Sequence, residues 1–357
     1  MKKTTWLALV MSAVLLIAGC GSKNENNSNA STDTSNAGTA TEGTNTGGGN
    51  ADQQSYTIAI SQIVEHPSLD ATREGFLAAL KDAGLVEGEN LTVDYENAQG
   101  DQTNNNTIAQ KIAGDKNDLV FGIATPSAQA LVKNVTDRPV LFAAVTDPLG
   151  AKLVSSLEQP GGNVTGASDT NPEATTKLVE FIAANFPNVK KVGLVINEGE
   201  SNAVVMATKA EEELKKHGME LVKAPVTNTS EVKQAAESLI GRVDAFYITL
   251  DNMVVSGVDA ILQVAKKNQL PFFSSDRDTV EKGAFATVGF KYYDHGYQVG
   301  QMAVEILKNG KKPAEMNVMM QDKLDLIINA KVAADYGITV TDEMKNAVTD
   351  QAENLIQ

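Results

Sequence analysis

Residues 119–145 read LVFGIATPSAQALVKNVTDRPVLFAAV and decide the fold class. The runs 119–125 and 140–145 are apolar almost throughout and rich in β-branched and aromatic residues, which is typical of strands covered on both faces. Between them, Pro126 and the polar residues around it favour a helix that opens near Ser127. A buried strand, a helix and a second buried strand form the repeating unit of a parallel α/β sheet.

The same alternation of strand and helix continues along the chain from Ser55. A helix is predicted where DATREGFLAALKDAG ends at Gly84, and another where Asn171 and Pro172 provide an N-cap and a first-turn proline. The remaining predicted strands are Tyr56–Ser61, Leu91–Glu96, Lys191–Asn197, Glu220–Pro225, Val243–Thr249, Pro271–Ser274 and Ala284–Phe290. We therefore expect an α/β protein with doubly wound parallel sheets.

The chain is too long for one such sheet, and residues 159–172, QPGGNVTGASDTNP, are rich in turn formers. We expect two doubly wound lobes joined by hinge strands. Residues 55–166 with about 289–320, including a long helix over 294–307, form the first lobe, and residues 167–288 form the second. Residues 321–357 are assigned to a hinge crossing and a C-terminal segment.

The first residues predict an exported lipoprotein. Lys2 and Lys3 precede an apolar run that is too short to span a bilayer and stops at Cys20. We expect residues 1–19 to be a signal peptide and Cys20 to be lipidated. Residues 20–54, which are polar and Gly-, Ser-, Asn- and Thr-rich, would be a disordered tether to the outer face of the cell membrane. The alternative is an ordinary signal peptide or a short membrane anchor.

Composition argues against several other classes of function. The net charge of −15 disfavours nucleic acid and anionic lipid headgroups as partners. Cys20 is the only cysteine, so neither a disulfide framework nor a thiol nucleophile is present in the body of the chain. The histidines lack metal-ligand spacing, and no nucleophile elbow or phosphate-binding loop is found. We expect a monomer that is not an enzyme and holds no cofactor or metal.

Polar residues follow the predicted strands at their carboxyl ends, where open parallel sheets bind ligands. Thr125, Ser127 and the free N–H groups near Ala128 form a neutral donor cluster that suits a carboxylate. Four acidic residues are candidates for holding an ammonium group: Asp147, Glu200, Asp251 and Asp276. The other candidates in these loops are Gln62, Glu65, Ser201, Asn202, Asn252 and Phe290. Donors and carboxylates together predict an amino-acid zwitterion, although Ser, Thr and Asp at such positions are usually helix caps.

Six short runs, taken in order, resemble the ABC-transporter substrate-binding lipoproteins of the tryptophan/tyrosine-binding type. They are 65–70 EHPSLD, 97–101 NAQGD, 125–130 TPSAQA, 145–148 VTDP, 160–166 PGGNVTG and 197–202 NEGESN. This resemblance covers nearly all of residues 56–340. It implies a type I periplasmic-binding fold, two lobes that close over an aromatic amino acid, and delivery to a permease with its ATPase subunits.

The only tryptophan, Trp6, would be lost with the signal peptide, so any stacking on the ligand falls to phenylalanine and tyrosine. Phe290 and Tyr292 are expected near the cleft, whereas Phe121 and Phe142 are expected in the core. Two rival functions stay open at this stage. One is a ligand-sensing receptor of the same fold that imports nothing, and the other is a surface enzyme that uses the acidic loops.

Overall fold

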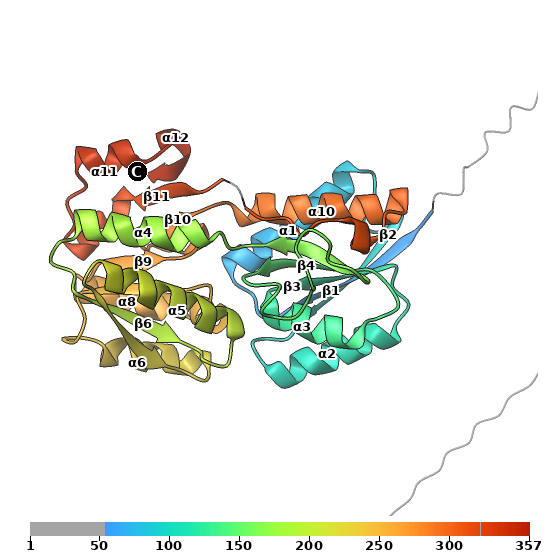
Figure 1. The fold of residues 1–357 in the computed structure, drawn as a ribbon, viewed down its shortest axis with the longest axis horizontal. Coiled ribbons are helices and arrows are strands. Elements are labelled where there is room, and N and C mark those ends of the chain that lie inside the picture. Colours follow the sequence, from blue (N-terminus) through green and yellow to red (C-terminus); the bar gives the residue numbers. More distant parts are fainter. Residues whose placement is uncertain (1–53, 322) are drawn as a thin grey trace, which may run out of the picture. The chain divides into compact units, whose positions relative to one another are not determined.

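The computed structural model describes residues 54–321 and 323–357, so the predicted signal peptide, Cys20 and nearly all of the tether lie outside the described residues. The first lobe is built on a five-stranded, all-parallel sheet of order β2-β1-β3-β4-β5 (Figure 1). Its strands are β1 (Tyr56–Gln62), β2 (Leu91–Asn97), β3 (Leu119–Ile123), β4 (Val140–Val145) and β5 (Val164–Ser168).

Helices cover both faces of this sheet, because its strands are apolar on both faces. Ile58 and Ile60 of β1 pack toward α1 (Pro67–Asp82) and α10 (Tyr292–Asn309), while Ala59 packs toward α2 (Gln102–Gly114) and α3 (Thr125–Asn134). Successive side chains of a strand point to opposite faces, which explains this division. Phe121 and Phe142, expected in the core, are fully buried.

Helix α10 crosses α1 at very close range, and glycines make this possible. A Cβ on Gly296 would lie 1.9 Å from the Thr72 carbonyl oxygen, and one on Gly300 would lie 2.5 Å from the Phe76 carbonyl oxygen. Only glycine fits where two backbones approach so closely. The crossing fixes the first turns of both helices, which carry Ser68 and Tyr292, beside each other at the carboxyl end of the sheet.

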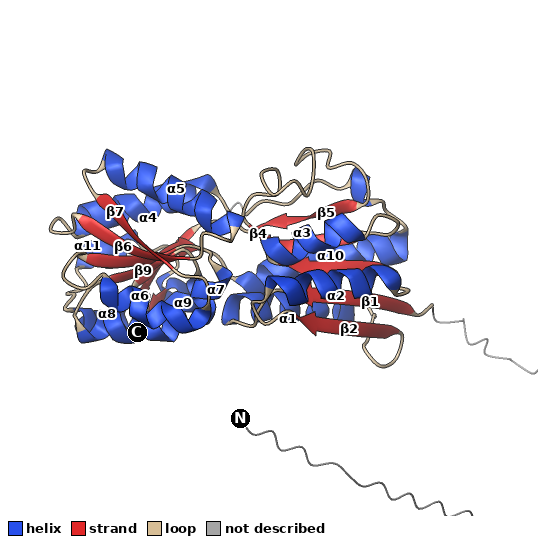
Figure 2. Ribbon diagram, turned by 90° about the horizontal axis from the view of Figure 1, so that it is seen from below, coloured by secondary structure: helices blue, strands red, loops and turns tan. Residues whose placement is uncertain are grey.

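The second lobe contains a seven-stranded sheet of order β12-β11-β10-β9-β8-β6-β7. Its strands are β6 (Lys191–Ile196), β7 (Glu220–Pro225), β8 (Ala245–Ile248), β9 (Phe272–Ser274), β10 (Ala286–Gly289), β11 (Asp325–Asn329) and β12 (Leu355–Ile356). Only the β10–β11 pair is antiparallel. The α-helices of this lobe are α4 (Pro172–Asn185), α5 (Ser201–Lys216), α6 (Val232–Ser238), α7 (Asn252–Ser256), α8 (Val258–Lys267), α9 (Arg277–Lys282), α11 (Asp342–Ala347) and α12 (Gln351–Asn354) (Figure 2).

Short 3₁₀ helices occupy three further places, η1 (Thr229–Glu231), η2 (Pro313–Glu315) and η3 (Ala330–Tyr336). Throughout residues 54–321 and 323–357, every helix falls short of the length and apolarity that a membrane crossing requires.

The chain passes between the lobes after β5, after β10 and before β11. The first and the third of these crossings are joined by hydrogen bonds. Ser168 donates its backbone N–H to the Met319 carbonyl at 2.8 Å, and Met319 donates to the Gly166 carbonyl at 2.9 Å. The Asn171 side chain also donates to the Gln321 carbonyl. A paired hinge of this kind limits the lobes to rotation about the crossings rather than free separation.

Each strand predicted from the sequence is a strand in the structure, with ends shifted by a few residues. The turn-rich stretch 159–172 was expected to be a seam, but its centre forms β5, whose edge position tolerates glycine and threonine. Residues 321–357, expected as a hinge crossing and tail, also contribute β11 and β12 to the sheet of the second lobe. Asn171 caps α4 by accepting from the N–H of Glu173, as its position predicts.

Candidate functional site

Two cavities lie where the carboxyl ends of strands from both lobes face each other, and they meet at Asp169 and Leu250. The first, here the polar cavity, is lined by His66, Ser68, Leu69, Ala144, Asp169, Leu250, Asn252, Val255, Asp276 and Tyr292. The second, here the apolar cavity, is lined by Asp169, Thr170, Asn171, Ala174, Thr175, Leu178, Met206, Tyr247, Leu250, Ser275, Val288, Gly289, Phe290 and Leu324. This is the position at which α/β sheets bind ligands.

Hydrogen bonds across the polar cavity connect elements of both lobes. The Ser68 hydroxyl, at the start of α1, donates to Asp276 Oδ1 at 3.1 Å, and Asp276 is the N-cap of α9. The Tyr292 hydroxyl, at the start of α10, donates to Asp169 Oδ2 at 3.0 Å. Both ring nitrogens of His66 are buried without a hydrogen-bond partner among the described residues, and burial lowers the pKa of its imidazole.

The cavities carry concentrated negative charge. Asp169 is 5% exposed, and its burial raises the pKa of its carboxyl to about 6 although Tyr292 and Thr170 donate to it. Beside Asp276, burial and the neighbouring charge raise the pKa of the Asp278 carboxyl to about 7. Among the residues that line the two cavities, no lysine or arginine balances these groups. Buried carboxylates without a cation nearby suit a ligand that brings its own positive charge.

The apolar cavity has a different character. Leu178, Met206, Val288 and Phe290 form walls, and a partly buried pair of hydroxyls lines the same cavity, those of Tyr247 and Ser275, which are 2.6 Å apart. The space open to a water-sized sphere is about 20 Å³, roughly that of one water molecule. A ligand therefore enters only when the lobes move apart.

Strained backbone marks the same strand ends. Ala124 after β3 has φ 78° and Ala144 at the end of β4 has φ 54°, which is the left-handed region that glycine favours. Such conformations cost on the order of 1 kcal/mol and occur preferentially at functional sites. Ala144 lines the polar cavity, and its N–H donates to His295 Nε2 at 3.0 Å. Burial lowers the pKa of His295 to about 3, so this nitrogen is free to accept.

The predicted carboxylate cradle lies at the start of α3 and does not line either cavity. Thr125, Ser127 and Ala128 are buried there, and Ser127 donates to Asn105. The Thr125 hydroxyl is buried and has no partner among the described residues. The roles of these three residues stay predictions.

Two of the acidic candidates bind backbone instead of facing the cavities. Glu200 accepts from the side chains of Asn202 and Asn252 and from two backbone N–H groups, so it fixes the loop after β8 against α5. Asp251 caps α7 and accepts from the Asn197 N–H at 2.6 Å. Acidic residues after strands thus serve here as the caps that such positions favour.

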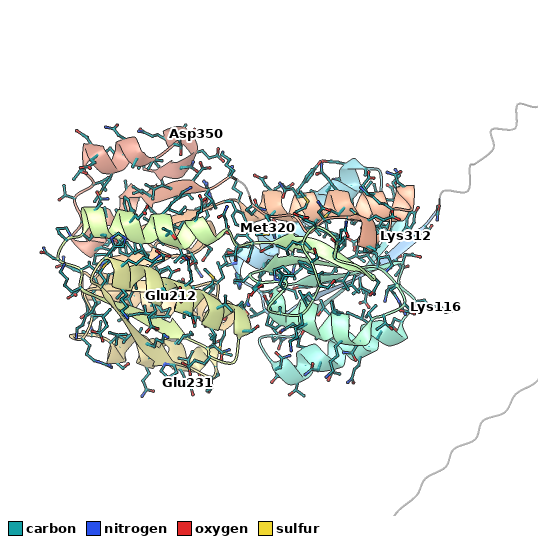
Figure 3. The ribbon with its side chains drawn as sticks, viewed as in Figure 1. Lys116, Glu212, Glu231, Lys312, Met320 and Asp350 are labelled. Atoms are coloured by element: carbon teal, nitrogen blue, oxygen red, sulfur yellow. The ribbon has the colours of Figure 1, made fainter. Side chains whose placement is uncertain are left out.

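The other predicted residues lie around the cavities. Gln62 is buried and bonded to Asp70 and Arg73, and Glu65 accepts from Tyr95. Ser201 is exposed at the start of α5. Asp147 caps its own turn and lines a third cavity of about 290 Å³ that also includes Met320, labelled between the lobes in Figure 3. Asn252, Asp276 and Phe290 do line the two cavities described above.

Sequence reasoning missed His66, Ser68 and Asp169 as lining residues and gave Tyr292 only as an aromatic near the cleft. His66 and Ser68 belong to the segment that begins at the end of β1, from which only Gln62 and Glu65 were predicted as site residues. Asp169 directly follows β5, which was not recognised as a strand, so the rule about strand ends was not applied there. Recognition of VTGAS (Val164–Ser168) as a strand would have extended the rule to Asp169.

The chain is similar to known proteins in both sequence and fold. The sequence matches the family described as ABC transporter substrate binding protein over residues 57–351. A tyrosine-binding protein of Clostridioides difficile strain R20291 is 40% identical over 272 residues, which are 76% of this chain and 78% of that protein.

Two solved structures are also similar. One is a domain from Streptococcus pneumonia in complex with L-Trp, with a TM-score of 0.79, 34% identity, and coverage of 85% of this chain and 100% of that chain. The other is a ligand-free, open substrate binding protein with adhesive properties from Clostridium difficile, with a TM-score of 0.61, 38% identity, and coverage of 84% and 98%. At similar identity, the described fold lies nearer to the ligand complex than to the open form.

Proposed function

Because the chain belongs to the family of ABC transporter substrate-binding proteins, we propose that it is the extracytoplasmic binding subunit of an importer for an aromatic amino acid, tryptophan or tyrosine. The family match supports the transporter context. The tyrosine-binding relative and the structure bound to L-Trp support the class of ligand. In this role the protein releases its ligand unchanged and is not an enzyme.

One observation carries the choice of ligand. The two cavities join at Asp169, so that a carboxylate-lined space continues directly into a space with apolar and aromatic walls. An amino acid with a ring matches both parts, since its ammonium suits the carboxylates and its side chain suits Met206, Leu178 and Phe290. Asp276 lines the polar cavity and Asp251 does not, which supports Asp276 together with Asp169 as partners of the ammonium.

The ligand's carboxylate needs donors, and the start of α3 is the best candidate for supplying them. The Thr125 hydroxyl lacks a partner among the described residues, and the first N–H groups of a helix have no carbonyl partner within it, although the Ala128 N–H already donates to the Ala124 carbonyl at 3.0 Å. Opening at the hinge would admit the ligand, and closure would bury it between both sets of groups. We keep Thr125, Ser127 and Ala128 as the proposed carboxylate cradle.

A thermal-shift screen of the twenty amino acids on the purified protein tests the ligand class. A ligand that binds only the folded state raises the melting temperature, and at one hundred times its Kd it adds about 2.7 kcal/mol of stability. We expect tyrosine and tryptophan to raise the melting temperature and glycine, lysine and glutamate not to. If no aromatic amino acid does so, the proposed ligand class is wrong.

Import and anchoring need a test in cells. Deleting the gene should reduce uptake of the labelled amino acid, and returning the intact gene should restore it. A Cys20→Ser variant should appear in the medium instead of the membrane fraction, because the acceptor of the lipid is gone. Normal uptake without the gene would instead favour a receptor that senses the ligand.

A further inference from the structure

The apolar cavity is lined by hydroxyl groups that the proposed function does not yet use. Tyr247 comes from β8, Ser275 follows β9 and Thr175 belongs to α4, and all three line the cavity. Tyr247 is 4% exposed and Thr175 is 6% exposed. Three hydroxyls from three separate elements therefore converge on a space whose other walls are mainly aliphatic and aromatic. We call these three hydroxyls the hydroxyl cluster of the cavity.

These hydroxyls keep free hydrogen-bonding capacity. The Tyr247 and Ser275 oxygens are 2.6 Å apart, which uses one proton and one lone pair, and Thr175 is a second neighbour of the Tyr247 hydroxyl. Each hydroxyl offers one donor and two acceptor positions. A hydroxyl of a ligand can thus both donate a hydrogen bond to this cluster and accept one from it.

The polar groups that line the apolar cavity are of two kinds. Asp169 lines both the apolar and the polar cavity, whereas Tyr247, Ser275 and Thr175 line the apolar cavity and not the polar one, and Thr175 also lines the third cavity. A ligand whose ammonium is held by Asp169 and whose ring packs against the apolar walls shares this cavity with the hydroxyl cluster, so a polar substituent on the ring can be recognised there. A phenolic oxygen is the substituent that matches this position.

We propose that Thr175, Tyr247 and Ser275 are specificity-determining residues that recognise a phenolic hydroxyl on the ligand, so that tyrosine is preferred to phenylalanine. This inference rests on the proposed function and adds to it the chemistry of the ring. The preference is moderate, because Tyr247 and Ser275 satisfy each other when a ring without a hydroxyl is bound. We expect tyrosine to bind about three- to tenfold more tightly than phenylalanine, which is the gain from one net hydrogen bond.

Calorimetry on the unmodified protein makes the first comparison, with tyrosine, phenylalanine and O-methyltyrosine as ligands. The methyl ether removes the phenolic proton and adds bulk, so it should bind more weakly than tyrosine. Equal affinity for tyrosine and phenylalanine overturns this inference and leaves the proposed function standing. If none of the three binds but tryptophan does, this inference fails and the proposed function stands; if tryptophan does not bind either, both fail.

Two variants then assign the preference to the residues. Tyr247→Phe and Ser275→Ala should each reduce the tyrosine-to-phenylalanine affinity ratio toward one, mainly through weaker tyrosine binding. Tyr336→Phe is the matched control, because its hydroxyl is also buried but donates to the Gly283 carbonyl away from both cavities. That variant should keep the ratio of the unmodified protein. An unchanged ratio in both cavity variants overturns the assignment, and since a ratio compares two ligands on one protein, a general loss of stability does not mimic it.

Discussion

Replacing Asp169 by asparagine should stabilise the ligand-free protein at alkaline pH while it weakens ligand binding. The carboxyl has a pKa of about 6 in the fold and about 3.9 when unfolded, a rise caused by burial. An acid whose pKa is raised by folding favours the folded state at pH values below its unfolded pKa. That contribution is lost as the pH rises through about 6.

The size of this effect on the free energy of unfolding follows from the rise in the pKa of Asp169. Two units of pKa correspond to about 3 kcal/mol that the ionised Asp169 costs the folded state at pH 8. Asparagine removes the charge and keeps an oxygen for the Tyr292 hydroxyl, but its new N–H groups need partners, at a cost of about 1 kcal/mol. We therefore expect Asp169→Asn to raise the free energy of unfolding by about 1–3 kcal/mol at pH 8. At pH 4, where the carboxyl is protonated in the fold, the variant should leave the free energy of unfolding unchanged or lower it by up to about 1 kcal/mol.

Urea denaturation without ligand at both pH values measures this effect, and calorimetry at pH 8 measures the affinity. The variant should lose about tenfold or more in affinity, since a charged hydrogen bond to the ammonium is gone. Asp294→Asn, on the exposed side of the first turn of α10, is the control and should change stability by less than about 0.5 kcal/mol. A variant that is less stable than the parent at pH 8, or equally affected at both pH values, refutes the reasoning.

The remaining predictions concern packing, ligand contact and acid sensitivity. Gly296→Ala should lower the free energy of unfolding by about 1–3 kcal/mol in urea denaturation, because its Cβ would meet a carbonyl oxygen, whereas Gly114→Ala, with open space around it, should not destabilise. Asp276→Ala should weaken ligand binding about tenfold or more by calorimetry, and unchanged affinity would remove it from the site. His295 has a folded pKa of about 3 against about 6.5 unfolded, so its contribution to stability is present above pH 6.5 and declines below it, by about 2 kcal/mol at pH 5. His295→Asn should therefore differ less from the parent at pH 5 than at pH 7.5, and a constant difference would contradict this.

Much of the fold could be predicted because buried parallel strands have a strong signature. Runs such as Val140–Val145 are apolar at every position, which predicts a strand that is covered on both faces. Strand β5 was missed because its sequence, VTGAS, contains small and turn-forming residues beside two further glycines. Its place in the sheet is set by pairing with β4, a long-range contact that no local pattern encodes.

The candidate site was only partly predictable for a related reason. Sequence identifies which residues follow a strand, but which of their side chains face the cleft depends on local hydrogen bonds. Glu200 and Asp251 turn toward backbone N–H groups, while Asp276 caps α9 and still reaches Ser68 of the other lobe. An acidic residue after a strand can thus either bind only backbone N–H groups or also face the other lobe. Which of the two occurs depends on its three-dimensional contacts.

Because helix α10 belongs to the first lobe but follows the second lobe's strands β6 to β10 in the sequence, the first lobe can be completed only after those strands have been synthesised. Val299, Met302 and Ala303 complete the apolar cluster that covers Phe76 and Phe121. These residues are translated only after the strands β6 to β10 of the second lobe. The first lobe therefore cannot bury this face of its sheet while the chain is still growing through residue 290. Until α10 arrives, that face stays open to chaperones or to aggregation, and the two lobes should complete folding together instead of one after the other.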